Sequence, residues 1–323
     1  MSLTAQDIEP ALPRWPEVAG GTASLINHSE NQTFRIEAPG QGAFTLRVHR
    51  SGYQSEASIR SELAWLAALR RDTTLNIPEP VPGADGQLLQ CVDTPAGPRN
   101  AVLFRFIAGR EPRADDDLGD LFVTLGQYAA TMHNHVAAWR QPDGFQRPRW
   151  QAATILDVDA PWGDWRMAPG VNDRNRPVLD RLDAALWQRL AAYGTGPDRY
   201  GLIHADMRLG NILVDGNQVA LIDFDDCGFC WFAYDFAAAI SFHETRPDVP
   251  VLREAWLRGY QTVRQLDAAD IAAFDSMIML RRMALLAWIG SHADTALARQ
   301  HMPGFADGTA ELAERYLRGP IWS

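Results

Sequence analysis

Gly201-Leu-Ile-His-Ala-Asp-Met-Arg-Leu-Gly-Asn-Ile-Leu-Val-Asp215, followed by Val219-Ala-Leu-Ile-Asp-Phe-Asp-Asp226, carries a set of polar side chains at defined spacing: His204, Asp206, Asn211 and Asp223. Phosphoryl transfer needs a carboxylate that orients and deprotonates the attacking hydroxyl, and it needs oxygen ligands that hold Mg²⁺ on the nucleotide phosphates. Two aspartates and one asparagine supply that set. The stretch therefore predicts a phosphotransfer site.

The surroundings of these residues favour this interpretation. Leu213-Val214 and Val219-Ala-Leu-Ile222 flank Asp215-Gly-Asn217, a pattern typical of a tight hairpin turn between two short strands. The alternative is a loop of solvated aspartates that follows a buried histidine. That alternative does not account for the two apolar strands beside the motif.

The pattern resembles the catalytic and metal-binding loops of the protein-kinase-like fold, in the form His-x-Asp-x-x-x-x-Asn and then Ile-Asp-Phe. The continuation from Asp225 to Phe236, with Tyr234 and Asp235, is similar to the aminoglycoside phosphotransferase and choline kinase superfamily. Within it, the chain resembles most the branch of homoserine kinase type II and stress response kinase A. The resemblance implies an α+β, bilobal protein-kinase-like fold with a small antiparallel-sheet N-lobe and a larger, mainly helical C-lobe.

The resemblance also implies roles for the catalytic residues. Asp206 would accept the proton of the acceptor hydroxyl or orient that hydroxyl toward the γ-phosphate of ATP. His204 would brace the catalytic loop. Asp235 would hydrogen-bond that loop from the start of the next helix, and a simple helix N-cap is the other interpretation of this aspartate.

Three oxygen-bearing residues are the predicted ligands of Mg²⁺. The resemblance assigns Asn211 and Asp223 to the metal that bridges the nucleotide phosphates. Asp225 adds negative charge nearby, so we expect it to be an auxiliary ligand. ATP and Mg²⁺ are accordingly the expected co-substrate and cofactor.

The N-terminal part should bind the nucleotide. Residues 25–36 alternate in their second half, residues 43–49 alternate again, and Pro39-Gly-Gln-Gly42 joins them as a turn, which predicts an antiparallel hairpin. The loop 27–32 lies where a phosphate-covering loop is expected, although it lacks the Gly-x-Gly-x-x-Gly pattern. Its contacts would come from the backbone of Ser29, Glu30 and Asn31.

A cation and a glutamate are predicted to form a pair in this lobe. Arg47 occupies the strand position where protein kinases carry a phosphate-binding lysine, and the resemblance implies the same role for it. Residues 55–71 have apolar positions at helical spacing, and Glu62 on that helix is the expected partner, with Glu56 as the alternative. The alternative for Arg47 is an exposed strand cation.

The small lobe should end near residue 108. Prolines prevent a helix over residues 76–82, residues 87–92 and 100–107 are predicted strands, and Ala108-Gly109 breaks the second strand. The backbone of the four residues before this break is the expected adenine contact: Phe104, Arg105, Phe106 and Ile107. We therefore expect a nucleotide-binding lobe over residues 1–108 and a helical lobe over 109–323.

The second lobe should be helical. Apolar residues recur at helical spacing over residues 118–140, 251–265, 268–290 and 310–317. His133 and His135 are two residues apart on one helix and cannot both face one metal ion, so we expect a helix cap or a solvated face there. Residues 141–176 are rich in Trp, Pro, Gly and Asp, which is typical of a functional insertion.

Composition is consistent with a cytoplasmic enzyme. The 323 residues exceed what one core usually contains, and the formal net charge of −10 argues against nucleic acid as a partner. The chain has no apolar run of membrane-span length and no signal-peptide pattern, so no membrane partner is expected. Its three cysteines suit reduced thiols better than a disulfide framework or a zinc site. Monomer and homodimer both remain open.

The expected reaction transfers the γ-phosphate of Mg-ATP to a hydroxyl of a small molecule that resembles an amino alcohol, homoserine or an aminoglycoside. A protein serine/threonine kinase and a non-catalytic pseudokinase are the alternatives. Residues of the helical lobe that could line an acceptor pocket are Asp159, Trp162, Asp164, Trp165, Trp231 and His243. For each tryptophan, packing in the interior is the simpler expectation.

Overall fold

The computed structural model describes residues 2–28 and 31–322, and it divides into two compact units. The first contains residues 1–111, 140–147 and 212–225, and the second contains residues 112–139, 148–211 and 226–323. Each unit is described by itself. Within the described residues, no helix combines the length and the apolar character that a membrane span needs.

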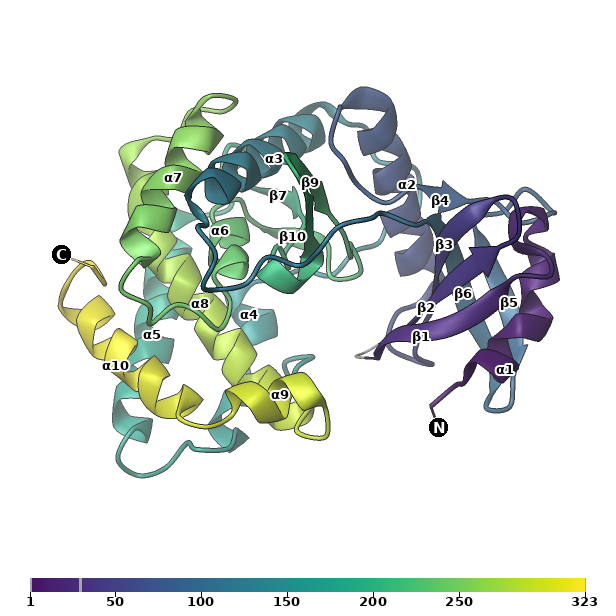
Figure 1. Ribbon diagram of the computed structural model, residues 1–323. Coiled ribbons are helices and arrows are strands. Elements are labelled where there is room, and N and C mark those ends of the chain that lie inside the picture. Colours follow the sequence, from purple (N-terminus) through teal and green to yellow (C-terminus); the bar gives the residue numbers. More distant parts are fainter. Residues whose placement is uncertain (1, 29–30, 323) are drawn as a thin grey trace. The chain divides into compact units, whose positions relative to one another are not determined.

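The first unit is built around an antiparallel sheet, drawn from purple to blue in Figure 1. Its strands pair in the order β1-β2-β3-β6-β4, and β5 pairs with β6. The bounds are β1 (Thr22–His28), β2 (Gln32–Ala38), β3 (Gly42–Val48), β4 (Pro80–Val81), β5 (Leu89–Thr94) and β6 (Gly97–Arg105). The predicted hairpin of β2 and β3 is confirmed, whereas β1 is a strand that the sequence did not reveal.

Helices complete this unit. The helix α2 (Glu56–Asp72) begins where the Ser55 side chain accepts a hydrogen bond from the Ser58 N–H, and it buries Ile59, Leu63 and Leu66. Short helices precede the sheet: α1 (Ala5–Ile8), η1 (Glu9–Arg14) and η2 (Pro16–Val18). The predicted second hairpin is also present, as β8 (Ile212–Asp215) and β9 (Gln218–Leu221). It places the Asp223 segment in this unit.

The second unit is mainly helical, as predicted. Its helices are α3 (Gly119–Ala138), α4 (Ala152–Ile155), η3 (Trp165–Met167), α5 (Arg176–Tyr193), η4 (Leu209–Asn211), α6 (Tyr234–Ala239), α7 (Val249–Gln261), α8 (Ala268–Ser291), α9 (Ala296–His301) and α10 (Phe305–Arg318). A short antiparallel pair, β7 (Tyr200–Ile203) and β10 (Gly228–Trp231), brings the loop after β7 beside the start of α6. The sequence did not indicate α5 or this pair, whereas α6 is the helix that the resemblance placed at Tyr234 and Asp235.

Two glycines let α3 and α7 pack at very short range. A Cβ atom built on Gly126 would lie 2.2 Å from the carbonyl oxygen of Trp256, and one on Gly259 would lie 1.9 Å from that of Val123. Neither distance leaves room for a side chain, because real Cβ contacts stay beyond 3.0 Å. The close helix pair therefore depends on glycine at both positions.

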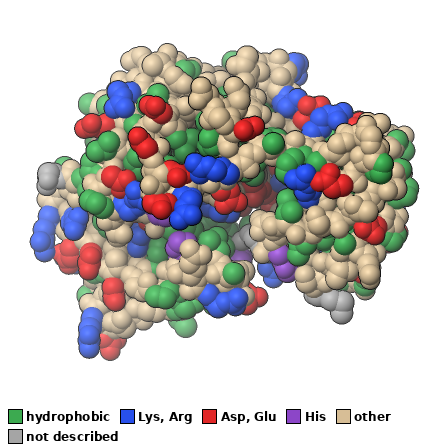
Figure 2. Space-filling model, in the orientation of Figure 1, with side chains coloured by type: hydrophobic (Ala, Val, Ile, Leu, Met, Phe, Trp, Pro, Cys, Tyr) green, Lys and Arg blue, Asp and Glu red, His purple; other side chains and the backbone are tan. Residues whose placement is uncertain are grey.

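The cations of this chain are all arginines, because the sequence contains no lysine. Figure 2 shows these blue side chains next to red carboxylates on the visible face. Arginine carries a planar fork of donors that can contact several acceptors at once. That property decides the geometry of both polar clusters described below.

Candidate active site

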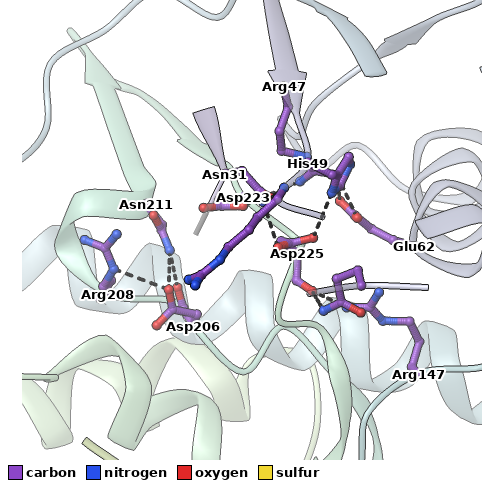
Figure 3. A network of polar contacts seen from close by, with 12 residues as sticks. Asn31, Arg47, His49, Glu62, Arg147, Asp206, Arg208, Asn211, Asp223 and Asp225 are labelled. Atoms are coloured by element: carbon purple, nitrogen blue, oxygen red, sulfur yellow. Dashed lines mark hydrogen bonds and ion pairs between the residues drawn. The ribbon is translucent and has the colours of Figure 1, made fainter. Parts of the chain in front are cut away.

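The residues predicted from the sequence form two polar clusters, one in each unit. The first lies around Arg47 and the second around Asp206. Ser29 and Glu30, expected to cover phosphates, lie outside the described residues. Figure 3 shows the side chains of both clusters.

The first cluster is centred on a buried ion pair between β3 and α2. Nη2 of Arg47 lies 2.8 Å and 2.7 Å from the two carboxylate oxygens of Glu62. The side chains are only 8% and 1% exposed. Burial opposes the charge of Arg47, but the neighbouring carboxylates of Glu62, Asp225 and Asp223 outweigh it and raise the pKa of Arg47. The predicted pairing of Arg47 with Glu62 is thus present, and Arg47 is not an exposed strand cation.

A backbone turn after β9 separates two side chains of opposite character. Asp223 has a positive φ of 62°, which few non-glycine residues adopt, and its side chain is 39% exposed. Its Oδ1 lies 3.5 Å from Nη1 of Arg47. The next residue, Phe224, is buried and packs edge-on against Trp65 of α2, with ring centroids 5.6 Å apart. The turn therefore presents the carboxylate while the phenyl ring anchors the loop.

Asp225 is held far more tightly than Asp223. It is buried, and its Oδ2 accepts a hydrogen bond of 2.8 Å from Nδ2 of Asn31. Its backbone carbonyl accepts hydrogen bonds from Gln54 and Arg147. Burial raises the pKa of Asp225, but Arg47, His49 and Arg147 outweigh it and lower the pKa overall. The carboxylate is therefore kept ionised by its surroundings.

The end of β6 offers one backbone donor. The N–H of Arg105 bonds to the carbonyl of Glu79, and the N–H of Phe106 bonds to that of Ala43. Among the described residues, the N–H of Ile107 has no such partner. Phe104 lies under the Arg47 guanidinium, 5.3 Å from its ring centroid to Cζ. Of the four residues predicted to contact adenine, Ile107 is thus the one whose backbone N–H remains to bind a ligand.

In the second cluster, both oxygens of Asp206 are engaged. Oδ1 accepts a 2.5 Å hydrogen bond from Nη2 of Arg281, and Oδ2 accepts one of 2.7 Å from Nδ2 of Asn211. Nε of Arg208 lies 3.3 Å from Oδ2. Asn211 also donates to the backbone carbonyl of Asp206, at 2.8 Å. The side chain of Asp206 is therefore fixed by Arg281, Asn211 and Arg208, of which Figure 3 labels Asn211 and Arg208.

Arg281 uses three nitrogens of its guanidinium for this task. Besides Asp206, it donates to the hydroxyl of Ser241 at 2.9 Å and to the carbonyl of Ala205 at 3.4 Å. Its side chain is 3% exposed. Burial raises the pKa of Asp206, but Arg281, Arg208 and His204 outweigh it and lower the pKa. Asp206 is accordingly an oriented, ionised carboxylate.

The loop before Asp206 has a strained backbone, and Asp235 accepts hydrogen bonds from its N–H groups. Ala205 has a φ of 67°, and its N–H donates to Oδ1 of Asp235 at 2.7 Å. The N–H of His204 lies 3.4 Å from Oδ2 of the same carboxylate. Nδ1 of His204 accepts a 3.2 Å bond from the Asp206 N–H. Asp235 thus contacts the catalytic loop as predicted, and the N-cap alternative is wrong, because the N-cap residue of α6 is Ala233.

The support of Asp235 continues through His133, which the sequence analysis placed wrongly. His133 is fully buried rather than a cap or a solvated residue. Nε2 of His133 lies 3.0 Å from Oδ2 of Asp235, and Nδ1 lies 2.9 Å from the hydroxyl of Tyr260. Burial lowers the pKa of His133 despite Asp235, so the ring is neutral: Nε2–H donates to Asp235 and Nδ1 accepts from Tyr260. The packing of α3 on α7 supplies this contact.

The candidate acceptor residues mostly serve packing. Trp162, Trp165 and Trp231 are buried, as expected for interior tryptophans, and Trp165 donates to Asp183. Trp162 alone of these three has a ring beside Arg281, with Cζ 5.7 Å from the ring centroid. Asp164 caps η3, Asp159 is exposed, and His243 is half-buried. All three cysteines are free thiols, and burial raises the pKa of Cys230.

The sequence model of the phosphotransferase enzyme family matches residues 22–273, which is well over half of the chain. The chain belongs to the phosphotransferase enzyme family. It is accordingly a phosphotransferase, as the sequence predicted.

Solved structures and curated relatives agree with this family. The structure of a microcompartment-associated aminopropanol kinase is 41% identical, covers 98% of each chain and has a TM-score of 0.89. Amicoumacin kinase hAmiN, solved with AMP-PNP, Ca²⁺ and Ami, is 21% identical, covers 97% of this chain and 93% of that one, and has a TM-score of 0.76. A homoserine kinase of Gluconobacter oxydans is 27% identical over 84% of each chain. The predicted α+β, protein-kinase-like fold is thereby confirmed.

Arg281, like Arg208, is a residue of the Asp206 cluster that the sequence analysis did not identify. A signal was available, because Arg281 and Arg282 interrupt an otherwise apolar stretch of α8. Buried charges in such a stretch need carboxylate partners. Arg282 has Glu244 at 2.8 Å and Arg281 has Asp206. Periodicity shows that the partners must exist, but it does not identify them.

Proposed function

We propose that the protein is a kinase that transfers the γ-phosphate of Mg-ATP to the hydroxyl of a small amino alcohol similar to aminopropanol. The observation that carries this proposal is the Asp206 carboxylate, ionised and fixed by Arg281 and Asn211. The choice of acceptor is supported by the 41% identity to the aminopropanol kinase along nearly the whole of both chains. Identity at that level favours a related acceptor.

Asp206 is the residue that we assign to the hydroxyl. A carboxylate held on both oxygens cannot rotate away, so it can orient the hydroxyl and take its proton as the bond to phosphorus forms. Its low pKa makes it a weak base, and this suits a loose transition state in which the proton leaves late. His204 and Asp235 keep the loop in its strained form.

Arg208 is the further cation that we assign to the reacting phosphoryl group. Its side chain is 23% exposed, compared with 3% for Arg281, and its bond to Asp206 is the longer one. Arg281 is therefore a fixed support, whereas Arg208 can turn toward phosphate oxygens. Such a cation stabilises charge that develops on the transferred group.

The first unit would bind the nucleotide. Arg47, oriented by Glu62, would contact phosphate oxygens, and the free N–H of Ile107 would contact adenine. Asn31 and Ser29 stay predicted contacts of the phosphates, and Ser29 lies outside the described residues. We keep residues 1–108 as the nucleotide-binding lobe and residues 109–323 as the lobe that carries the catalytic loop and selects the acceptor.

The oxygen donors present suit magnesium. Asn211 uses its Nδ2 for Asp206, so its amide oxygen remains for a cation, and Asp223 has a partly exposed carboxylate. Oδ1 of Asp225 is buried and has no hydrogen-bond partner among the described residues. Hard carbonyl and carboxylate oxygens of this kind are what Mg²⁺ prefers, and the ion, when bound, neutralises phosphate charge.

The remaining partners follow from this proposal. The acceptor is a small molecule rather than nucleic acid or a membrane, and a cytoplasmic location supplies both ATP and reduced thiols. Homoserine shares the ammonium and hydroxyl groups of an amino alcohol but adds a carboxylate. Comparing the two compounds therefore tests which acceptor chemistry the helical unit selects.

The test is an ATP-consumption assay with Mg²⁺ over 1-amino-2-propanol, ethanolamine, homoserine, an aminoglycoside and a generic protein substrate. We expect turnover with the amino alcohols and a loss of about 10²–10⁴-fold in the Asp206→Asn variant. Arg258→Gln, an exposed change on α7, is the control for the substitution itself. Turnover with the protein alone would replace the proposal by a protein kinase. Mg-ATP binding without turnover of any acceptor would replace it by a pseudokinase.

A further inference from the structure

The loop that leaves α6 contains a strained aromatic residue. Phe242 has a φ of 69°, a value that bulky side chains rarely adopt. Among the described residues, the other non-glycine residues with a positive φ are Ala205 and Asp223, which lie on the catalytic loop and on the predicted metal-binding loop. Strained backbone concentrates at functional sites. Phe242 is therefore a candidate for a role in the reaction.

A short chain of hydrogen bonds connects this loop to Asp206. The preceding residue, Ser241, accepts a hydrogen bond of 2.9 Å from Nε of Arg281, and Nη2 of the same arginine donates to Asp206 at 2.5 Å. Ser241, Phe242, Arg281 and Asp206 all belong to the second unit. The loop with Phe242 thus begins two hydrogen bonds away from the carboxylate that we assign to the acceptor hydroxyl.

Phe242 stacks on an imidazole whose nitrogens are open to a ligand. The rings of Phe242 and His301, the last residue of α9, lie 16° from parallel, with centroids 4.0 Å apart. His301 is half-buried, and within the part of the chain that the structure describes its ring forms no hydrogen bond. Neither of its nitrogens is closed off from solvent. By contrast, Nδ1 of His292, which stacks on Trp288, is bonded to Ser291 at 2.9 Å.

The ring of His301 is a neutral hydrogen-bond acceptor near neutral pH. Burial lowers its pKa, and the charges of His243 and Arg208 lower it further, against the opposing effect of Glu244. A neutral imidazole has one N–H donor and one acceptor nitrogen. Arg208, which contacts Asp206, therefore lies near enough to act on this ring.

Glu244 makes the surroundings of His301 favourable for a cation. Its side chain is fully buried, and Oε2 accepts a hydrogen bond of 2.8 Å from Nη1 of Arg282. Its Oε1 has no hydrogen-bond partner among the described residues. Glu244 opposes the lowering of the pKa of both His243 and His301, so it stabilises positive charge at their position. A cationic ligand beside His301 gains the same stabilisation.

We propose that His301 is the specificity-determining residue that binds the ammonium group of the acceptor. Its acceptor nitrogen receives a hydrogen bond from the ammonium, Phe242 holds the ring by stacking, and the hydroxyl of the same small molecule meets Asp206. This inference rests on the function proposed above, and it names the group with which the helical unit recognises an amine.

The test is steady-state kinetics of His301→Phe with 1-amino-2-propanol at saturating Mg-ATP. Phenylalanine keeps an aromatic ring that can stack on Phe242, but it has no nitrogen to accept the bond. We expect KM for 1-amino-2-propanol to rise about tenfold or more, because a hydrogen bond to a charged group is lost, while kcat and KM for ATP stay unchanged. In His301→Gln the amide oxygen can still accept, so this variant should have a lower KM than His301→Phe.

A second compound separates the hydrogen bond from the charge. The N,N,N-trimethyl derivative of 1-amino-2-propanol keeps the positive charge and has no N–H to donate. As a substrate or as a competitive inhibitor, it should bind equally well to wild type and to His301→Phe. Equal losses of affinity for both compounds in His301→Phe would show that the nitrogen accepts no bond from the ammonium.

His292→Phe is the matched control, because His292 is also half-buried and stacked but has its Nδ1 already bonded. It should leave KM unchanged. An equal rise in both phenylalanine variants, or an unchanged KM in His301→Phe, would overturn the inference and leave the proposed function standing. No turnover of any amino alcohol by wild type would overturn the proposed function, and this inference with it. Melting temperatures like that of wild type would confirm that the variants fold.

Discussion

Each polar cluster contains one buried pair of an arginine and a carboxylate, Arg47–Glu62 in the first and Arg281–Asp206 in the second. We assign the arginine of the first pair and the carboxylate of the second pair to a substrate. In the Arg47–Glu62 pair the arginine is the more exposed member, at 8% against 1%, and in the Arg281–Asp206 pair the aspartate is, at 13% against 3%. The more exposed member is in each case the one that we assign to a substrate. The buried member is a support. In both pairs, the group that we assign to a substrate is therefore the more accessible one.

The pairs also differ in the number of guanidinium nitrogens that form hydrogen bonds. Arg47 places a single nitrogen between the two oxygens of Glu62. Arg281 divides three nitrogens among Asp206, Ser241 and Ala205. We infer that charge matters most at position 47 and that the guanidinium fork matters most at position 281.

The largest effect is expected from Arg281→Gln. The substitution leaves a mostly buried carboxylate without its main partner, which costs about 3 kcal/mol of unfolding free energy. The misplaced Asp206 should also lower kcat by about 100-fold. Nucleotide affinity should not change. Urea unfolding, kcat and nucleotide titration would measure the three quantities, with Arg258→Gln as the control. A wild-type kcat would contradict the supporting role of Arg281.

The next effect concerns α3 and α7, the helices that carry His133 and Tyr260 and so position Asp235 beneath the catalytic loop. Gly126→Ala inserts a methyl group into backbone atoms of α7 and should lower the free energy of unfolding by about 3 kcal/mol. Gly196→Ala is the matched control, because a Cβ there has no atom within 4 Å. Thermal or urea unfolding compares the two variants. Equal stability would show that α3 and α7 can separate without loss.

Lysine substitutions at positions 47 and 281 keep the positive charge but remove the planar guanidinium group, so they test which of the two properties each site needs. Arg47→Lys keeps a cation that can reach Glu62, so nucleotide affinity should fall by about tenfold or less, a cost of roughly 1.4 kcal/mol. Arg281→Lys cannot serve three acceptors and should lose kcat almost as severely as Arg281→Gln. Nucleotide titration and steady-state kinetics would measure these losses. Equal losses for the two lysine variants would remove the distinction drawn between the pairs.

A smaller effect is expected from Tyr260→Phe. The change removes the donor to Nδ1 of His133 and leaves a buried acceptor unpaired, which costs about 1 kcal/mol of unfolding free energy. A several-fold fall in kcat should accompany it if the His133 and Asp235 contacts hold the strained loop. Unfolding and kinetics on the same preparation would test both. Lost stability with unchanged kcat would confine His133 to packing.

The smallest effect is in the pH dependence of stability. The pKa of Asp206 lies below the ordinary 3.8 in the folded state, so its ionisation stabilises the fold above that pH and ceases to do so as the pH falls through the folded value. Wild type should therefore lose more unfolding free energy between pH 6 and pH 3 than Arg281→Gln does. Urea unfolding at both pH values measures the difference. Parallel losses would show that Arg281 does not set this pKa.

Local patterns explain how much of the first cluster could be predicted. Arg47 and Glu62 lie on a strand and the following helix, and the spacing of apolar residues fixes which face of each is buried. The hairpin around Asp215 was equally readable from its turn residues. The exception is β1, whose residues are almost all exposed and so lack the alternation that predicts a strand.

The second cluster could be predicted only in part. The loop from His204 to Asn211 is a motif of fixed spacing, but its supports come from α3, α6, α7 and α8. Arg281 is distant from Asp206 along the chain, and no period or cap connects the two. His133 lies on a helix whose buried stripe was partly recognised, yet a histidine on that stripe could not be assigned a partner. Tertiary contacts of this kind follow from helix packing, which cannot be read from the local patterns of a single sequence.

The glycine contact between α3 and α7 has an evolutionary consequence. Any nucleotide change that replaces glycine adds a Cβ atom, so no amino-acid substitution at Gly126 or Gly259 avoids the clash with the facing backbone. In a deep mutational scan, these two codons should be as intolerant as the codon of Asp206, although neither residue touches a substrate. Substitutions at other positions of this unit can therefore accumulate while the crossing of α3 and α7 beneath the catalytic loop stays fixed.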